Sequence, residues 1–387
     1  MNRPRAYLDW NATAPLLDEA REAFLRVSFM PGNPSSVHNE GRAIRREIET
    51  ARRLVAEAVG GKAANVTFTS GATEAANLIL TPDFRMGRAP LAVSRLYVSG
   101  IEHKAVFDGG RFPAESVTLI PVDRDGVVDH DALSALLDAH DKASGLPMVA
   151  VMAANNETGV LQPIAEIARL THQAGGLLVV DAVQALGRLP LDIEALEADF
   201  LILSSHKIGG PKGAGALVAR GETLMPAPLL RGGGQEKGHR SGTENAGAIA
   251  GFGAAAALAA RDIDMRAASL GALRDRIEAQ MAAIAPDMVV HARSAPRLPN
   301  TSFFSLDGLK PETGQIAFDL EGVALSAGSA CSSGKVSESH VLKAMGLDPR
   351  LGALRISIGP DTSEEDAVRF LEAFRKVASR LGKADAA

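Results

Sequence analysis

Cysteine and aromatic residues are scarce in this sequence of 387 residues. It contains one cysteine, Cys331, which excludes an internal disulfide and suits a reducing compartment, so we expect a cytoplasmic protein. Aromatic residues make up 4% of the chain, which is too few for the stacking platforms that bind single-stranded nucleic acid. The net charge of -5 likewise gives no reason to expect nucleic acid or a membrane surface as a partner.

Long apolar runs and metal-binding motifs are also missing. The longest uncharged stretch, residues 246–260, consists mostly of Ala and Gly and is shorter than the ~20 apolar residues that span a bilayer, so we interpret it as a buried helix. The N-terminus shows no apolar signal core. The nine histidines lack H-E-x-x-H spacing and a single cysteine cannot form a C-x-x-C pair, so we expect no metal site.

Strand and helix patterns alternate between about residues 60 and 220, which predicts a mostly parallel sheet covered by helices on both faces. The pattern changes after the Ala-rich helix. An amphipathic stretch at 270–284 precedes strand-like segments at 300–306, 323–325 and 354–358, and residues 362–365 form a capping box for a last helix. This second part indicates a smaller α+β domain, and the chain is long enough for both.

Polar side chains follow five of the predicted strands. In open α/β sheets, ligands bind beyond the carboxyl ends of the strands. A lysine and an acid at neighbouring strand ends are the two anchors that a pyridoxal phosphate enzyme needs. The lysine forms the Schiff base, and the acid keeps the pyridine nitrogen protonated. The five residues are Thr73, His103, Asn156, Asp181 and Lys207.

Two other segments bear on phosphate binding. The strand at 66–69 breaks at 70–74 and continues as a helix, so backbone N–H groups and the Thr73 hydroxyl can face an anion. The Gly-rich loop at 232–243 neither follows a strand nor ends in G-K-[ST], which argues against a nucleotide P-loop. No G-x-S-x-G motif is present to suggest a serine hydrolase.

A series of short motifs carries a resemblance to a known family. The sequence resembles the cysteine desulfurases of the NifS/IscS type, within the class V aminotransferase group of fold-type I pyridoxal phosphate enzymes. Each motif is weak alone, but their shared order and spacing run almost from end to end. The matching segments are residues 7–9, 32–36, 68–74, 102–106, 155–157, 181–184, 205–207, 240–243, 329–331 and 339–342.

The resemblance implies the α/β architecture of fold type I. A large domain at 14–258 would hold a mostly parallel seven-stranded sheet and the cofactor. A smaller α+β domain, formed by 1–13 and 259–387, would carry the loop with the catalytic cysteine. The family also implies a homodimer with composite active sites.

Within that family, four residues would surround the ring of pyridoxal 5'-phosphate. Lys207 would be the Schiff-base lysine, and Asp181 would pair with the pyridine nitrogen. Gln184 would hydrogen-bond the phenolic oxygen of the ring. His103 would stack on the ring face and serve in proton transfer.

The resemblance also implies residues for the substrate and for the cofactor phosphate. Asn156, which also borders the cofactor, and Arg355 would bind the substrate carboxylate, for which a planar guanidinium is suited. The phosphate ligands would be Ala72 through its backbone, Thr73, Ser204, His206, and Thr243 from the second subunit.

Cys331 lies in a run of small polar residues at 326–335, and an exposed loop of this kind suits a nucleophilic thiol. In the family, this cysteine attacks the sulfur of bound L-cysteine. The resemblance therefore implies that L-cysteine is converted to L-alanine, with the sulfur left as a persulfide on Cys331. Because the chain has no second cysteine, an outside acceptor must collect the sulfur, either an iron–sulfur scaffold or a sulfur carrier.

The sequence departs from the family pattern at two places and leaves alternatives open. Residues 10–14, beginning with Trp10, replace a run of small residues, and Pro360 stands where Arg is common. We interpret His38 and His340 as structural. A selenocysteine lyase remains an alternative that the sequence does not separate. A class V aminotransferase needs no cysteine in that loop, and a catalytically silent scaffold would not need Lys207.

Overall fold

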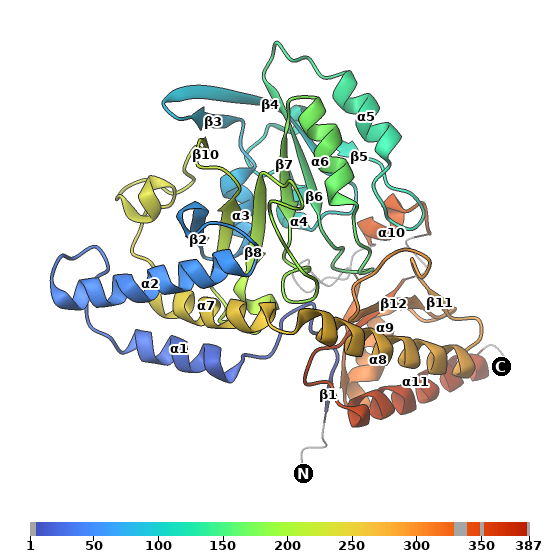
Figure 1. The fold of residues 1–387 in the computed structure, drawn as a ribbon. Coiled ribbons are helices and arrows are strands. Elements are labelled where there is room, and N and C mark those ends of the chain that lie inside the picture. Colours follow the sequence, from blue (N-terminus) through green and yellow to red (C-terminus); the bar gives the residue numbers. More distant parts are fainter. Residues whose placement is uncertain (1–4, 329–338, 349–351, 385–387) are drawn as a thin grey trace.

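A large twisted sheet forms the centre of the chain in the computed structural model, which describes residues 5–328, 339–348 and 352–384 (Figure 1). Seven strands follow the order β5-β4-β6-β7-β8-β9-β2, and β9 alone runs against its neighbours. The predicted seven-stranded, mostly parallel sheet is thus confirmed. The strands are β2 (Val66–Thr69), β4 (Ala89–Ser99), β5 (Val117–Ile120), β6 (Leu146–Met152), β7 (Leu177–Asp181), β8 (Phe200–Ser204) and β9 (Gly215–Ala219).

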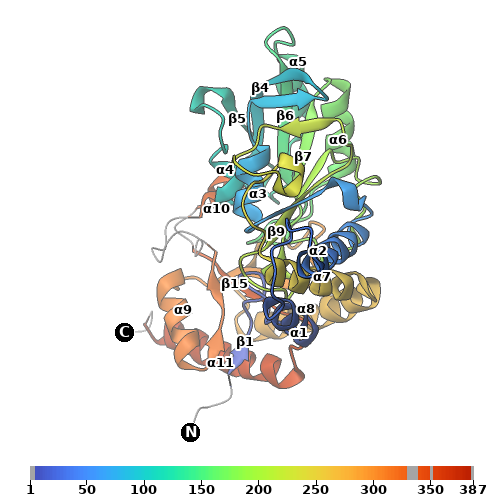
Figure 2. The same ribbon diagram turned by 90° about the vertical axis from the view of Figure 1, so that its left-hand side faces the viewer.

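Both faces of this sheet are buried, because successive side chains of its strands enter two different cores. In β7, Leu178 and Val180 contact one core, and Leu177 and Val179 contact the other. Helices α3 and α4 lie on one side and α2 and α6 on the other (Figure 2). The covering helices are α2 (Asn39–Glu57), α5 (His130–Asp138), α6 (Ile164–Gln173) and α7 (Ala246–Ala260) on the first face, and α3 (Ala72–Ile79) and α4 (Lys104–Phe107) on the second.

The sheet continues beyond the predicted strands. β3 (Asp83–Met86) pairs antiparallel with the N-terminal part of β4, and β10 (Leu224–Pro226) pairs antiparallel with β3, which brings the sheet to nine strands among the described residues. Helix α1 (Asp18–Ser28) packs against α7. Four 3-10 turns complete this part: η1 (Ala63–Asn65), η2 (Ala114–Ser116), η3 (Ser205–Lys207) and η4 (Gln235–Gly238).

A second core lies around a small sheet with the order β11-β12-β15-β14. Four phenylalanines, Phe304, Phe318, Phe370 and Phe374, stack within it. This separate core supports the proposed domain limits at residues 13/14 and 258/259, which stay a prediction. The elements around this core are β1 (Ala6–Tyr7), α8 (Ile263–Ile284), β11 (Val289–Val290), β12 (Thr301–Ser305), α9 (Pro311–Leu320), β13 (Val323–Ala324), β14 (Ser326–Ala327), β15 (Leu354–Ser357) and α11 (Glu364–Ala384). Helix α10 (His340–Ala344) instead packs through Val341 in a separate cluster with Ile101 and Met152.

The capping box of α11 lies one residue later than the sequence predicted. Ser363 Oγ accepts from the backbone N–H of Asp366 (3.1 Å), and the Asp366 carboxylate accepts from the N–H of Ser363 (2.9 Å). The Thr362 hydroxyl instead accepts a hydrogen bond from Gly359 N, in the turn before the helix. The prediction of a box that begins at Thr362 was therefore wrong.

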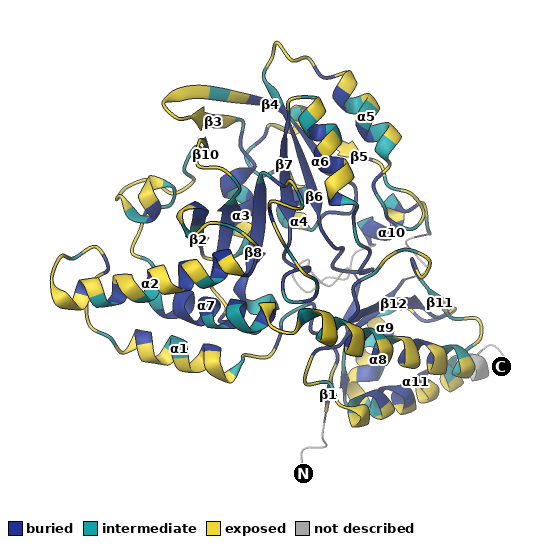
Figure 3. Ribbon diagram, in the orientation of Figure 1, coloured by how far each residue is buried: buried dark blue, intermediate teal, exposed yellow. Residues whose placement is uncertain are grey.

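Helix α7 is the Ala-rich segment, and most of its residues are buried, as predicted (Figure 3). Its packing explains the composition, because small side chains let neighbouring backbones approach. At Gly253, a Cβ atom would come within 2.6 Å of the Cα atom of Ala51 on α2. Within the described ranges, no single helix is long and apolar enough to cross a membrane. The pair α7 and α8 meets that test only together and is bent by 76°.

Candidate active site

The carboxyl ends of β4, β6, β7 and β8 lie near the small domain, and a pocket of ≈ 110 Å³ opens there. Residues 326–328, which lead toward Cys331, also line it. Cys331 itself lies outside the described residues. The pocket brings together eight of the site residues that the sequence analysis named: Ala72, Thr73, His103, Asn156, Asp181, Gln184, Lys207 and Arg355.

Lys207 ends the 3-10 turn η3, which follows β8 directly. Its Nζ atom donates to the carbonyl oxygens of Asn11 (2.6 Å) and Ala12 (2.9 Å). The N-terminal segment therefore forms the pocket wall that positions this amine.

Asp181 is the last residue of β7, and its side chain is buried. One carboxylate oxygen accepts from the N–H of Val183 at 2.9 Å. Burial raises the pKa of Asp181 to about 6, and the Val183 hydrogen bond and the charge of Lys207 oppose that rise. A cationic group placed next to this carboxylate would restore its ionised form.

Gln184 lies one turn after Asp181 and is also buried. Its Nε2 atom donates to Asn11 O at 3.1 Å, while its buried Oε1 atom has no hydrogen-bond partner in the described part of the chain. An unpartnered buried amide oxygen costs free energy unless a ligand satisfies it.

His103 precedes α4 and caps it, because its Nδ1 atom accepts from Ala105 N at 3.2 Å. This hydrogen bond assigns the ring proton to Nε2. Burial and the positive charges of Lys207 and His340 lower the pKa of His103 to about 4. The imidazole is therefore neutral at pH 7.

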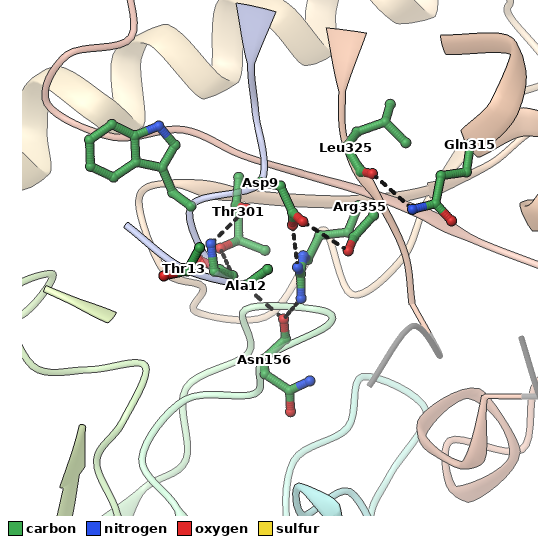
Figure 4. Close-up of polar contacts among 12 residues, drawn as sticks. Asp9, Ala12, Thr13, Asn156, Thr301, Gln315, Leu325 and Arg355 are labelled. Carbon is green, nitrogen blue, oxygen red and sulfur yellow. Dashed lines mark hydrogen bonds and ion pairs between the residues drawn. The ribbon is translucent and has the colours of Figure 1, made fainter. Parts of the chain in front are cut away.

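Arg355 comes from β15 of the small sheet and is buried, not a surface residue (Figure 4). Its guanidinium donates to the Asp9 carboxylate (2.7 Å) and to the main-chain oxygen of Asn156 (2.6 Å). Figure 4 shows the Asn156 side-chain amide turned away from this contact. Among the described residues, the buried Nε atom of Arg355 has no hydrogen-bond partner, which costs free energy unless a ligand satisfies this donor.

Two of the five predicted phosphate ligands line this pocket, and three do not. Ala72 and Thr73 line it from the first turn of α3. Ser204 and His206 do not line it. Ser204 nevertheless lies near the start of α3, because it pairs with Gly215 on β9. Gly215 is in turn so close to Gly71, the residue before α3, that a Cβ atom on Gly215 would lie 2.6 Å from it. His206 contacts the Thr13 hydroxyl through Nδ1 at 3.2 Å.

Thr243 is exposed and does not line the pocket of its own chain. The loop before it is fixed at two points. Arg240 forms an ion pair with Glu74 in the first turn of α3, and the side chain of Glu236 is buried against Arg52. The assignment of Thr243 to the site of a second subunit stays a prediction.

The sequence analysis gave no role to three residues that the structure places at the site. Asp9 pairs with Arg355, and Asn11 receives hydrogen bonds from Lys207 and Gln184. Glu157 accepts from the Ser339 hydroxyl (2.7 Å) and lies where a Cβ on Gly328 would approach it to 2.8 Å. Asp9 and Glu157 both lie in motifs that carry the family resemblance, so their positions in these motifs could have identified them as site residues from the sequence.

His38 and His340 have the structural roles that the sequence analysis proposed. His38 caps α2, because its Nδ1 atom accepts from Gly41 N at 3.3 Å. His340 contacts the carbonyl oxygen of Glu102 at 2.9 Å, and its ring lies 4.9 Å from that of Phe107.

A family model of the class-V aminotransferases matches residues 6–370. The chain belongs to this family. It is 37% identical to the cysteine desulfurase IscS of Dictyoglomus turgidum, over 97% of this chain and 95% of that protein. It is 40% identical to a cysteine desulfurase of Cereibacter sphaeroides, with 97% and 96% covered. The fold matches the crystal structure of a NifS-like protein from Rickettsia africae with a TM-score of 0.86, at 34% identity over 97% of this chain and 99% of that one.

Class-V aminotransferases depend on pyridoxal phosphate, and the pocket fits this cofactor. Lys207 would hold it covalently through Nζ, and a protonated ring nitrogen would stabilise the buried charge of Asp181. The orphaned amide oxygen of Gln184 marks a polar position that the ring substituents would fill. The start of α3, with Thr73, would receive the phosphate.

Proposed function

We propose that the protein is a pyridoxal phosphate-dependent cysteine desulfurase that converts L-cysteine to L-alanine and retains the sulfur on Cys331. One observation carries the proposal. Lys207, Asp181 and Arg355 line a pocket that residues 326–328 also line, and Cys331 follows Gly328 by three residues. Chain connectivity limits the distance from Gly328 to Cys331 to about 10 Å.

Arg355 binds the substrate carboxylate in this proposal. No described residue pairs with its Nε atom, and its Asp9 contact is an ion pair, so the carboxylate exchanges for Asp9 at one edge of the guanidinium. The second contact, to the Asn156 carbonyl, keeps the guanidinium in place during that exchange.

His103 and Lys207 transfer protons to and from the substrate in this proposal. The bound cofactor supplies an electron sink that acidifies the Cα–H bond of an amino acid. His103 is neutral at pH 7 and can accept a proton, and the Lys207 amine lies on the same pocket. Both groups are therefore available to remove the proton from Cα and to return one to Cβ.

The sulfur step uses Cys331. Its thiolate attacks Sγ of the substrate, so an S–S bond forms while the Cβ–Sγ bond breaks. Carbon is reduced, Cβ takes up a proton to give alanine, and the enzyme thiol is oxidised to a persulfide. No further oxidant is needed. An external acceptor protein, an iron–sulfur scaffold or a sulfur carrier, then removes the sulfur, because the chain has no second cysteine.

The decisive experiment mixes purified holoprotein with L-cysteine and measures alanine and protein-bound persulfide. Cys331→Ser should keep its cofactor and its spectral response to L-cysteine, because Lys207 and Arg355 are unchanged, but form neither product. Ser332→Ala, the neighbouring substitution, is the matched control and should behave as the unmodified protein. Alanine release by Cys331→Ser at the unmodified rate would contradict the proposal.

The same assay separates the alternatives. Turnover on L-selenocysteine by the unmodified protein, without turnover on L-cysteine, would identify a selenocysteine lyase. Formation of glutamate from a 2-oxo acid, independent of Cys331, would identify an aminotransferase. A colourless protein that binds no pyridoxal phosphate would point to a silent scaffold.

A further inference from the structure

The two places where the sequence departs from its family come together in a second cavity. Trp10 and Pro360 both line a cavity of ≈ 450 Å³ between the large and small domains. Gly359 lies against the Trp10 indole, where a Cβ atom would approach the ring carbon Cδ2 to 2.0 Å. Among the described residues, Lys207 alone lines both this cavity and the active-site pocket.

The N-terminal segment runs between the two spaces. Trp10 lines the larger cavity, whereas Asn11 and Ala12 line the active-site pocket. The carbonyl oxygens of Asn11 and Ala12 accept from Lys207 Nζ, and that of Trp10 accepts from Arg188. A molecule in the larger cavity would therefore contact the other side of the wall that positions Lys207.

Arg188 gives this cavity a buried positive charge. The side chain is 7% exposed and donates to the carbonyl oxygens of Gln184 (2.9 Å), Trp10 (3.4 Å) and Lys207 (3.4 Å). Within the described part of the chain, no carboxylate lies within 4.0 Å of it. Burial and the nearby Arg355 lower the pKa of Arg188 to about 9. A buried guanidinium without a counter-charge is unfavourable, and an anion in the cavity would offset that cost.

The charge distribution of the remaining lining favours an anion with an apolar body. Arg266 donates to Gly187 O at 3.2 Å, next to Arg188, whereas the two acids that line the cavity, Glu19 and Asp262, are exposed. The inner end is thus positive, and most of the remaining lining is hydrocarbon. The apolar lining residues are Leu17, Leu186, Ile208, Leu258, Leu270 and Ile358.

We propose that this cavity is a second binding site, for a small organic monocarboxylate with an apolar body. The carboxylate pairs with Arg188, supported by Arg266, and the apolar body packs against the aliphatic side chains and Trp10. The site is separate from the pocket that holds the cofactor and the substrate. Its ligand contacts the segment that positions Lys207, and so it can influence the active site without entering it.

The sole tryptophan of the chain provides the test, because Trp10 lines the cavity. Holoprotein is titrated with 3-phenylpropionate, and tryptophan fluorescence and calorimetry are recorded. We expect saturable binding of one molecule per chain. The neutral amide 3-phenylpropanamide should bind at least tenfold more weakly, and acetate, which lacks the apolar body, should also bind at least tenfold more weakly.

Two variants test the positive charge. Arg188→Met should weaken 3-phenylpropionate binding at least tenfold. Arg266→Gln is the second variant and should also weaken binding. Because both arginines also hold main-chain carbonyl oxygens, the cofactor content and the thermal unfolding of each variant are measured first, and only folded holoprotein is titrated. Arg169→Gln, an exposed arginine on α6, is the matched control and should change nothing.

Three outcomes would overturn the proposal. The first is the absence of saturable binding to the folded holoprotein. The second is equal binding of the acid and the amide, which would remove the role of the charge. The third is displacement of the probe by pyridoxal phosphate or L-cysteine in direct competition, which would place the probe in the active-site pocket.

Discussion

Lys207 and Lys212 lie five positions apart, yet we predict that replacement of each by alanine has a different effect on cofactor binding and activity. Lys207→Ala should lose the visible absorbance of bound cofactor and all alanine formation, because Lys207 is the one lysine among the described residues that line the pocket. Lys212→Ala removes an exposed lysine and should change neither. Absorbance spectra and cofactor content of both variants measure this difference. An unchanged visible spectrum in Lys207→Ala would exclude it as the covalent anchor.

His291 makes the small domain sensitive to acid. Its ring is buried, its Nε2–H donates to the Ser305 hydroxyl at 2.7 Å, and burial lowers the pKa of His291 to about 4. The unfolded chain, with a histidine pKa near 6.5, binds the proton more readily. The resulting stability is complete above about pH 6.5 and is lost as the pH falls toward 4.

Replacement of His291 by Gln should therefore flatten part of the acid decline in the free energy of unfolding, by at most about 3 kcal/mol between pH 6.5 and 4. Urea titrations over this pH range measure it. His38→Gln replaces an exposed histidine and serves as the control. Parallel curves for His291→Gln and the unmodified protein would contradict the assignment.

The sequence could predict the residues at strand ends but not their partners in the N-terminal segment. Asp181 and Lys207 follow apolar runs, and the sheet must bring such ends to one edge. Asp9 and Asn11 reach the site through a two-residue strand whose partner, β13, is remote in sequence. No local pattern records that pairing, and the backbone carbonyls that hold Lys207 carry no sequence signal at all.

At the scale of elements, the more deeply buried of the two ion pairs that fix the loop around η4 is Arg52–Glu236. Arg52 donates to both carboxylate oxygens of Glu236 (2.7 and 2.8 Å), and Phe68 N donates to the same carboxylate (2.9 Å). Glu236→Gln should destabilise the protein by about 3–5 kcal/mol, because the buried Arg52 would keep only the exposed Glu49 as a counter-charge. Chemical denaturation measures this loss.

Glu49 offers the matched control, because it contacts the same arginine from the surface. Its side chain is 57% exposed, compared with 1% for Glu236. Glu49→Gln should cost less than about 1 kcal/mol. Equal losses in the two variants would show that the loop is not held by the buried pair.

The elements themselves were predictable to different degrees. The central strands were identified because burial on both faces makes them continuous apolar runs. Strands β3 and β10 were not, because they are short, partly exposed and separated by most of the large domain. The capping box of α11 was placed one residue early, since the sequence does not show that the Thr362 hydroxyl is already bound to Gly359.

For the whole molecule, we predict a homodimer in which Thr243 serves the neighbouring site. Thr243→Val should weaken cofactor binding and activity. In that arrangement, a mixed dimer of a Lys207→Ala subunit and a Thr243→Val subunit contains one intact site. Co-expression with two affinity tags and purification through both should recover activity that neither parent has.

The control for this complementation is a mixed dimer in which both substitutions lie in the same subunit. Its other subunit keeps Lys207 but faces a Val at position 243, so activity should stay low. Equal activity of the two mixed dimers would disprove the exchange of Thr243 between subunits. Sedimentation that shows a fully active monomer would disprove the dimer itself.

The pairing of β1 with β13 also sets the order in which the molecule can be completed during synthesis. Ala6 pairs with Val323 and Asp9 with Ser357, so the earliest-made strand waits for segments made near the end. The large sheet can form as it leaves the ribosome, because its strands are close in sequence. A truncated product that stops before β13 has Lys207 but lacks Cys331 and the partners that hold the pocket wall. If the proposed function holds, such a truncated chain could not form a persulfide.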